Sequence, residues 1–351
     1  MKILILTVIL LLISPFKAYA ELDTEIRDYP EFNGYVERLS KGENPFTPEG
    51  VLNSLTDALF GEISRSKADL GAILTLAAAA GLLRLTDSLG SCHDAAYFCT
   101  YALMSATAVK LLGETAGYGS EVVHSICDFI TKLSPVFLGL MAASGKITSA
   151  AAFSPVLSGA VYVFTLAMDV IITPLVYMSA VFGIIGNISA KVQLTSFNKL
   201  LRSFARWVLT ALFTVFTSLT ALYGFNAPVL DALSAKSAKF AVGTLVPVVG
   251  GLLADTVDTV VSGTRVLKNA VGSAGMICVV VIAAFPVVKV WIIWFMLRLS
   301  AALAEPLCDK RMTVMLSDVS ESVGTVLALM LTAVMLFLIT IGIMLGLTGA
   351  A

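Results

Sequence analysis

The sequence predicts an all-α polytopic membrane protein with about six transmembrane helices, interfacial amphipathic helices and two re-entrant segments in an internal repeat. Hydrophobic residues occupy 58% of the 351 positions and charged residues only 13%, whereas soluble domains contain about 45–50% apolar and about 25% charged residues. Apolar runs recur at about the 20 residues that a helix needs to cross a bilayer. The formal net charge of −1 gives no attraction to nucleic acid. A soluble enzyme and a nucleic-acid-binding protein are therefore excluded.

The first twenty residues have the features of a secretory signal peptide. Lys2 supplies a positive charge, residues 3–13 are apolar, and Ala18 and Ala20 provide the small residues of a cleavage site before Glu21. The alternative, an uncleaved anchor, is disfavoured because the apolar run is short for a span. We therefore expect the mature N-terminus to be extracytoplasmic.

Residues 21–69 form an acidic extracytoplasmic segment in this prediction. They include eleven acidic and five basic residues, a net charge of −6. So short a segment does not bury a core of its own. It is either a solvated lead-in to the membrane domain or a docking surface for an extracytoplasmic partner.

Six apolar runs in the rest of the chain predict membrane spans. The first two form a two-span hairpin with an amphipathic helix over residues 70–132. The third carries one charge, Asp169, and is either one long span or two spans divided near Thr173 and Pro174. The runs cover residues 70–83, 95–112, 147–190, 207–224, 274–297 and 323–347.

Amphipathic stretches lie between the apolar runs. In each, apolar residues recur at helical spacing and charged residues occupy another side. Such helices either lie in the interface plane and cover a polar cavity, or serve as connectors on the lipid headgroups. They cover residues 121–132, 191–206, 255–268 and 303–321.

An internal repeat is suggested by two similar blocks that begin at Pro135 and Pro247. Each block has its glycine at the fifth position, Gly139 and Gly251. We expect membrane repeats over residues 133–224 and 245–351, separated by a linker at 225–244. Backbone broken by proline and glycine is tolerated at membrane depth where protein or water satisfies it, so both blocks are expected to be re-entrant.

The topology depends on how these blocks enter the membrane. Re-entrant blocks give six spans and parallel copies, whereas crossing blocks give eight spans and inverted copies. Six spans place the basic residues of 191–206 and 298–311 on the cytoplasmic side, in keeping with the positive-inside tendency. The agreement is partial, because Lys236, Lys239, Arg265 and Lys268 then lie outside.

Motifs for catalysis are missing from the sequence. No nucleotide-binding loop, zinc-protease motif or serine-hydrolase motif occurs, so we expect neither an enzyme nor a cofactor. Cys92 with His93 and His124 with Cys127 have metal-ligand chemistry. Cysteines in apolar runs usually act as small hydrophobes, and no metal site is predicted.

Five ionisable residues lie in or beside the apolar runs. An ionisable group at membrane depth usually faces a bundle interior or an aqueous path. We expect these residues to line a functional cavity; the alternative is that each pairs within the bundle or reaches the interface. The candidates are Lys110, Asp169, Asp255, Asp258 and Lys289.

One region resembles a known family. Residues 250–260 read GGLLADTVDTV, and the similarity continues through Ser262 and Gly263 to residues 268–272. This region resembles the signature of the stage III sporulation protein AE family. The signal peptide, the acidic segment and the alternation of spans with amphipathic helices are also similar, so the resemblance covers nearly the whole mature chain.

The resemblance implies a location and partners. Members of this family are multispanning proteins in the mother-cell membrane surrounding the forespore of endospore-forming bacteria. Their implied partners are a cytoplasmic ATPase and ring-forming subunits of a secretion-like complex from the same operon. The implied role is that of a channel or export-gate subunit. A non-conducting scaffold and an independent ion-coupled permease are the alternatives, and the resemblance implies no catalytic residue.

Overall fold

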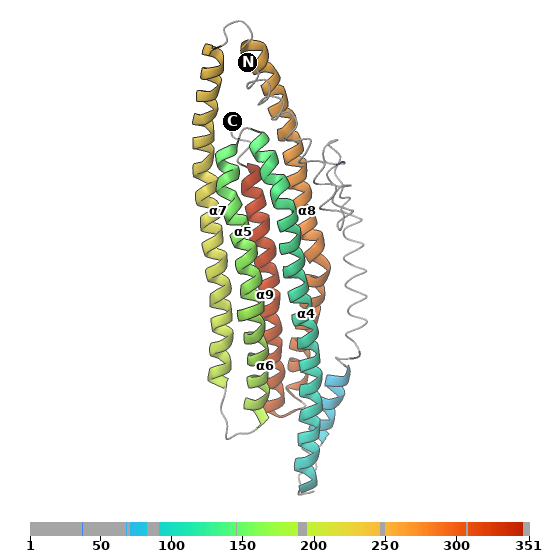
Figure 1. Cartoon of the computed structure of the whole chain (residues 1–351). Coiled ribbons are helices and arrows are strands. Elements are labelled where there is room, and N and C mark those ends of the chain that lie inside the picture. The colour runs from blue at the N-terminus through green and yellow to red at the C-terminus, as the bar shows by residue number, and fades with distance from the viewer. Residues whose placement is uncertain are drawn as a thin grey trace.

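The chain forms a long bundle of helices in which successive rods run in opposite directions (Figure 1). The computed structural model describes residues 37, 68, 71–82, 91–144, 146–188, 195–245, 250–306 and 308–346, and their side chains outside 91–94, 188, 195, 225–230, 232–262 and 346. The predicted signal peptide and almost all of the acidic segment lie outside these residues. The elements are α4 (Ser91–Ala143), α5 (Ile147–Leu166), the π-helix η2 (Ala167–Ile172), α6 (Thr173–Ile188), α7 (Thr195–Leu245), α8 (Gly250–Ala304) and α9 (Lys310–Gly346).

Five rods in the described part of the chain are long and apolar enough to cross a membrane. This confirms the all-helical class, because a helix satisfies its backbone hydrogen bonds internally where no water is present. Of the sixth predicted span, residues 70–83, the structure describes the apolar helix Gly71–Leu82. Its twelve described residues rise about 18 Å, less than the hydrocarbon thickness of about 30 Å, so this span stays a prediction.

One long helix replaces the predicted interfacial segment 121–132 and the predicted re-entrant block at Pro135. The helix α4 continues through residues 121–132, Pro135 and Gly139 to Ala143, since a helix tolerates the loss of one backbone hydrogen bond at proline when packing holds it. Gly251 lies in the first turn of α8, and Pro247 lies outside the described residues. The predicted linker 225–244 is helical and belongs to α7. The repeat stays a prediction.

The third apolar run forms one rod, which decides between the two alternatives for residues 147–190. The helices α5 and α6 are joined by η2, where the N–H of Thr173 donates to the carbonyl of Met168, five residues earlier. Pro174 has no N–H and its ring crowds the carbonyl four residues before it, so a widened turn is the local solution. Proline therefore produces a π-helical turn here instead of a break between two spans.

The centre of the bundle is α9, which packs against α4, α6, α7 and α8. Phe164 of α5 lies there, with its ring centroid 6.1 Å from that of Phe216 and 6.2 Å from that of Phe337. Large apolar side chains also point outward, among them Tyr162, Trp207 and Phe285. An apolar exterior around an apolar interior is expected where lipid is the solvent.

Close packing of α8 against α9 and α4 depends on Gly272. A Cβ atom added there would lie 2.5 Å from Cδ2 of Leu345 and 2.8 Å from Cε2 of Phe137. We expect Gly272→Val to destabilise the bundle by about 1–3 kcal/mol through overpacking, measured as a lower Tm of the detergent-purified protein. Gly263→Val on the same helix is the control, because nothing lies within 4 Å of its added Cβ. Equal losses in the two variants would contradict the packing explanation.

Candidate functional site

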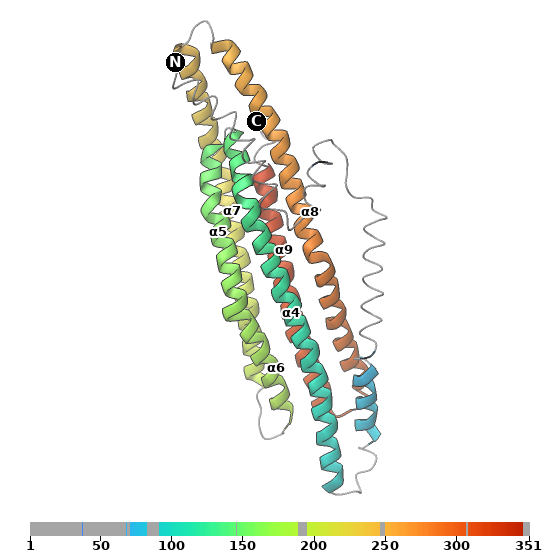
Figure 2. The ribbon, with the colours of Figure 1, turned by 45° about the vertical axis from the view of Figure 1, so that its right-hand side comes forward.

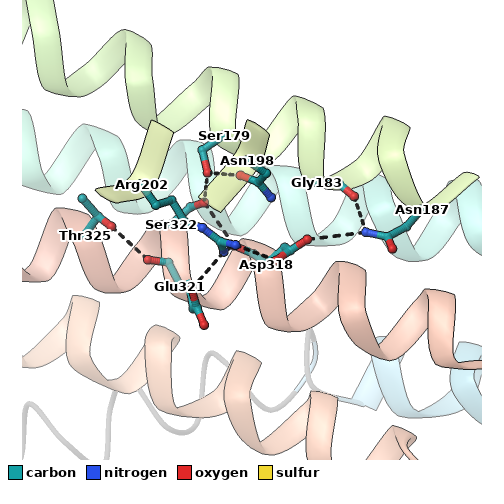
Figure 3. A network of polar contacts seen from close by, with 9 residues as sticks. All are labelled: Ser179, Gly183, Asn187, Asn198, Arg202, Asp318, Glu321, Ser322 and Thr325. Carbon is teal, nitrogen blue, oxygen red and sulfur yellow. Dashed lines mark hydrogen bonds and ion pairs between the residues drawn. The ribbon is translucent and has the colours of Figure 1, made fainter. Parts of the chain in front are cut away.

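A buried ion-pair network joins α6, α7 and α9 near one end of the bundle (Figure 3). Arg202 is 4% exposed, and its Nη2 lies 2.8 Å from Oδ1 of Asp318, which is 13% exposed. Its Nη1 donates to the carbonyl of Asp318 at 3.0 Å and lies 3.2 Å from Oε2 of Glu321. The guanidinium thus binds side chain and backbone of α9 together, as the fork geometry of arginine permits.

Uncharged polar groups extend this network. Ser179 donates to Oδ1 of Asn198 at 2.6 Å, and its hydroxyl lies 3.2 Å from that of Ser322. Asn187 donates to the carbonyl of Gly183 at 2.5 Å. The network fixes the register of α6 and α7 on α9. Sequence reasoning placed Arg202 only on a basic side and missed Asp318, because no local pattern links residues 116 positions apart.

A second buried charged group lies near the opposite end. Asp231 of α7 accepts hydrogen bonds from the N–H of Thr148 at 2.8 Å, the N–H of Ser149 at 3.1 Å and the Ser149 hydroxyl. A carboxylate here satisfies the free N–H groups at the start of α5. Burial and the charge of Arg265 lower the pKa of Lys146, while the charge of Asp231 raises it.

Lys268 of α8 also belongs to this end. Its Nζ donates to the carbonyl of Met344 at 3.3 Å and lies 5.8 Å from the ring centroid of Phe137. Asp318 and Met344 are 26 residues apart on α9, which corresponds to about 39 Å. The uncharged run 323–347 of α9 thus lies largely between two charged layers, at a spacing near the thickness of a bilayer with its headgroup regions, about 40–45 Å. We call this range the apolar depth.

One side of α4 carries polar and charged residues along much of its length. We call it the polar face of α4. Its members are separated by three or four positions, so they share one side of the helix. They are Lys110, Glu114, Tyr118, Glu121, His124, Asp128 and Lys132.

The polar face reaches into the apolar depth. Gly119 of α4 faces Val326 of α9, and Phe137 meets Leu345 beside Gly272. The parallel helices α4 and α9 therefore run in register from 119 to 137 and from 326 to 345. Glu121, His124, Asp128 and Lys132 lie alongside the uncharged run of α9, whereas Lys110 and Glu114 lie level with its charged residues.

His124 and Asp169 form a half-exposed pair between α4 and η2. Nδ1 of His124 lies 2.8 Å from the carbonyl of Ser120, which only accepts, so this nitrogen donates. Nε2 lies 3.3 Å from Oδ2 of Asp169. The side chains are 44% and 48% exposed.

Other charges on this face also have partners. Nζ of Lys289 on α8 donates to Oη of Tyr118 and lies 4.0 Å from its ring centroid. Nζ of Lys132 lies 3.0 Å from Oδ2 of Asp128. Nζ of Lys110 lies 3.9 Å from Oε1 of Glu114. Local pairing lowers the cost of charge at membrane depth.

The structure brings three of the five predicted ionisable residues together. Asp169 and Lys289 flank the polar face of α4, and Lys110 lies on it. Asp255 and Asp258 lie on α8, but their side chains are outside the described residues. Glu121, His124 and Asp128 were not predicted. Their spacing was visible in the sequence but was assigned to an interfacial helix.

A metal site that uses both cysteine–histidine pairs is excluded by the backbone. Cys92 and His124 lie on the same helix, α4, and their 32-residue separation corresponds to about 48 Å. Among the residues that the structure describes, no group of three His, Cys, Asp or Glu side chains is arranged to hold a metal ion.

Comparisons with known proteins give one consistent result. The family model described as Stage III sporulation protein AE matches residues 30–348. The Stage III sporulation protein AE of Bacillus subtilis (strain 168) is 30% identical to the chain over 309 residues, which cover 87% of the chain and 77% of that protein. No solved structure matches the chain.

Proposed function

The chain belongs to the stage III sporulation protein AE family, and from this we propose that it is the integral membrane channel or export-gate subunit of a sporulation complex. Its place is the mother-cell membrane around the forespore, and its partners are an ATPase and ring-forming subunits of the same operon. Family membership supports the complex and its partners. The export-gate role depends on the geometry of the polar face.

The observation that carries the gate role is the polar face of α4. Charged side chains that reach lipid are expensive, and in membrane proteins they usually mark a water-filled path or a subunit contact. The face runs from Lys110 to Lys132, about 33 Å along the helix, and His124 and Asp169 on it are half exposed. A non-conducting scaffold does not require a polar face at membrane depth. Movement of a substrate through the membrane along a polar path does require such a face.

The basic residues at one end of the bundle support an orientation. Arg202 lies near the start of α7, Arg298 near the end of α8 and Lys310 at the start of α9, and the positive-inside tendency favours a cytoplasmic location for this end. The helix Gly71–Leu82 lies there too, since the thiol of Cys308 donates to the carbonyl of Ala77 at 3.4 Å. An extracytoplasmic segment 21–69 is compatible with this only if the chain crosses the membrane before residue 71.

Neutralising the flanking charges tests the gate role. We expect Asp169→Asn or Lys289→Met, in a sporulating host that depends on this chain, to lower the yield of viable spores at least ~10-fold, because each change removes a charge that flanks the polar path. The complex should still assemble, as measured by co-purification with the ATPase and ring-forming subunits. Lys199→Met is the control, because Lys199 is exposed on α7 outside the apolar depth. Full spore yield in both variants would refute the gate role. Loss of assembly in both would favour the scaffold.

A further inference from the structure

The polar face of α4 has no cover among the described residues, although it lies at membrane depth. Asp128 and Asp169 are about half exposed. Glu121 is exposed, and no ion pair or hydrogen bond links its carboxylate to another described residue. Lipid does not solvate a carboxylate. The face must therefore meet water, a second copy of the chain, another protein or a part of this chain outside the described residues.

We propose that copies of this chain assemble as a closed ring with the polar faces of α4 turned inward, around a water-filled path. This inference deepens the proposed function and rests on it. The path then runs between copies and not through the interior of one bundle. The interior of a single bundle is filled at this depth by large side chains such as Phe164, Phe216 and Phe337.

The order of charges on the face argues for water between the copies. Copies in one membrane share one orientation, so each residue meets its own equivalent at the same depth. Glu121 then faces Glu121, and Asp128 faces Asp128. Like charges in dry contact are repulsive, whereas stacked rings of charged side chains around water line many ion paths. A ring is thus favoured over a dry two-copy contact through this face.

Opposite charges on the two flanks of the polar face indicate that the neighbour in the membrane is a second copy of this chain. Figure 2 shows α4 between the α5–α6 rod and α8, and both sides pack against it. Asp169 lies on the η2 side of the face and Lys289 on the α8 side. In a closed ring the α8 side of one copy meets the η2 side of the next, so opposite charges approach each other at every interface.

Single cysteines placed on two sides of the bundle test this arrangement. The variant Glu121→Cys lies on the polar face. Val215→Cys is the matched control, because Val215 is exposed on α7 on another side of the bundle and lies beside Phe216, which packs at the depth of Phe164. Both are made in a chain with Cys92 and Cys99 replaced by serine, expressed with its complex, and treated in native membranes. One reagent is a charged, membrane-impermeant thiol reagent, and the other is a bifunctional thiol cross-linker.

The ring predicts modification of position 121 by the charged reagent, and covalent dimers of the chain through position 121 with the cross-linker, because each copy offers one reactive thiol there. Position 215 should give neither. Glu114→Cys and Asp128→Cys repeat the test if Glu121→Cys does not accumulate. Cross-links from 121 to another subunit or to residues 21–69, without dimers of the chain, would overturn the ring. So would dimers without modification of position 121 by the charged reagent, because that result indicates a dry contact between two copies. Spore yield is not measured in this experiment, so the gate role could survive either outcome. Conversely, if the spore assay refutes the gate role, the ring still predicts both the dimers and the modification.

Discussion

Replacement of Arg202 by alanine is expected to destabilise the bundle by about 3–5 kcal/mol, because it leaves a buried carboxylate without its partner. Arg202 binds Asp318 through Nη2 at 2.8 Å and through the backbone carbonyl at 3.0 Å. The same contact joins α7 to α9, so its loss also frees the register of the two helices. The measurement is the Tm of the purified protein in detergent, together with its abundance in the membrane.

Two further variants separate the buried pair from a general charge effect. Glu321→Gln removes a carboxylate that also contacts Arg202, at 3.2 Å, but is 50% exposed. We expect this change to cost less than about 1 kcal/mol, as exposed ion pairs do. Arg202→Met with Asp318→Leu removes both buried charges and should recover much of the loss. A similar Tm for Arg202→Ala and Glu321→Gln would show that burial does not decide the effect.

Replacement of Asp231 by alanine is expected to be the second largest loss, about 2–4 kcal/mol. Two backbone N–H groups at the start of α5 and the Ser149 hydroxyl lose their acceptor at once. The buried Lys146 also loses the negative charge that favours its protonated form. The expected result is a lower Tm and faster hydrogen exchange at the first turn of α5.

Asp231→Asn removes the charge and one of the two acceptor oxygens. The amide oxygen can still accept from the N–H of Thr148, but the amide NH2 replaces Oδ2, which accepts from the N–H and the hydroxyl of Ser149. We expect a Tm between those of the wild type and Asp231→Ala. If the asparagine variant is as unstable as the alanine variant, one remaining acceptor oxygen does not stabilise this end of the bundle.

Hydrophobicity alone predicted most of the membrane architecture. The apolar runs around 95–112, 147–190, 207–224, 274–297 and 323–347 all fall in the five rods that are long and apolar enough to span. The sixth run stays a prediction, because only its residues 71–82 are described. The block at Pro135 is not re-entrant, because a single proline does not end a helix that is packed on both sides.

The candidate site was only half visible in the sequence. Asp169 and Lys289 stand out as single charges in apolar runs, and both flank the polar face of α4. Glu121, His124 and Asp128 belong to a stretch whose periodicity shows which side of the helix is polar. Periodicity does not show which solvent that side meets. An interfacial helix and a continuous transmembrane helix with one polar side have the same pattern.

The sequence by itself determined that the chain is built for lipid, because hydrophobicity is a property of each local run and needs no knowledge of its neighbours. Only the tertiary structure decided which charges meet. His124 and Asp169 are 45 residues apart, Arg202 and Asp318 are 116 apart, and Tyr118 and Lys289 are 171 apart. Such pairs form when packing sets the register of one helix against another, and no local pattern in the chain encodes that register.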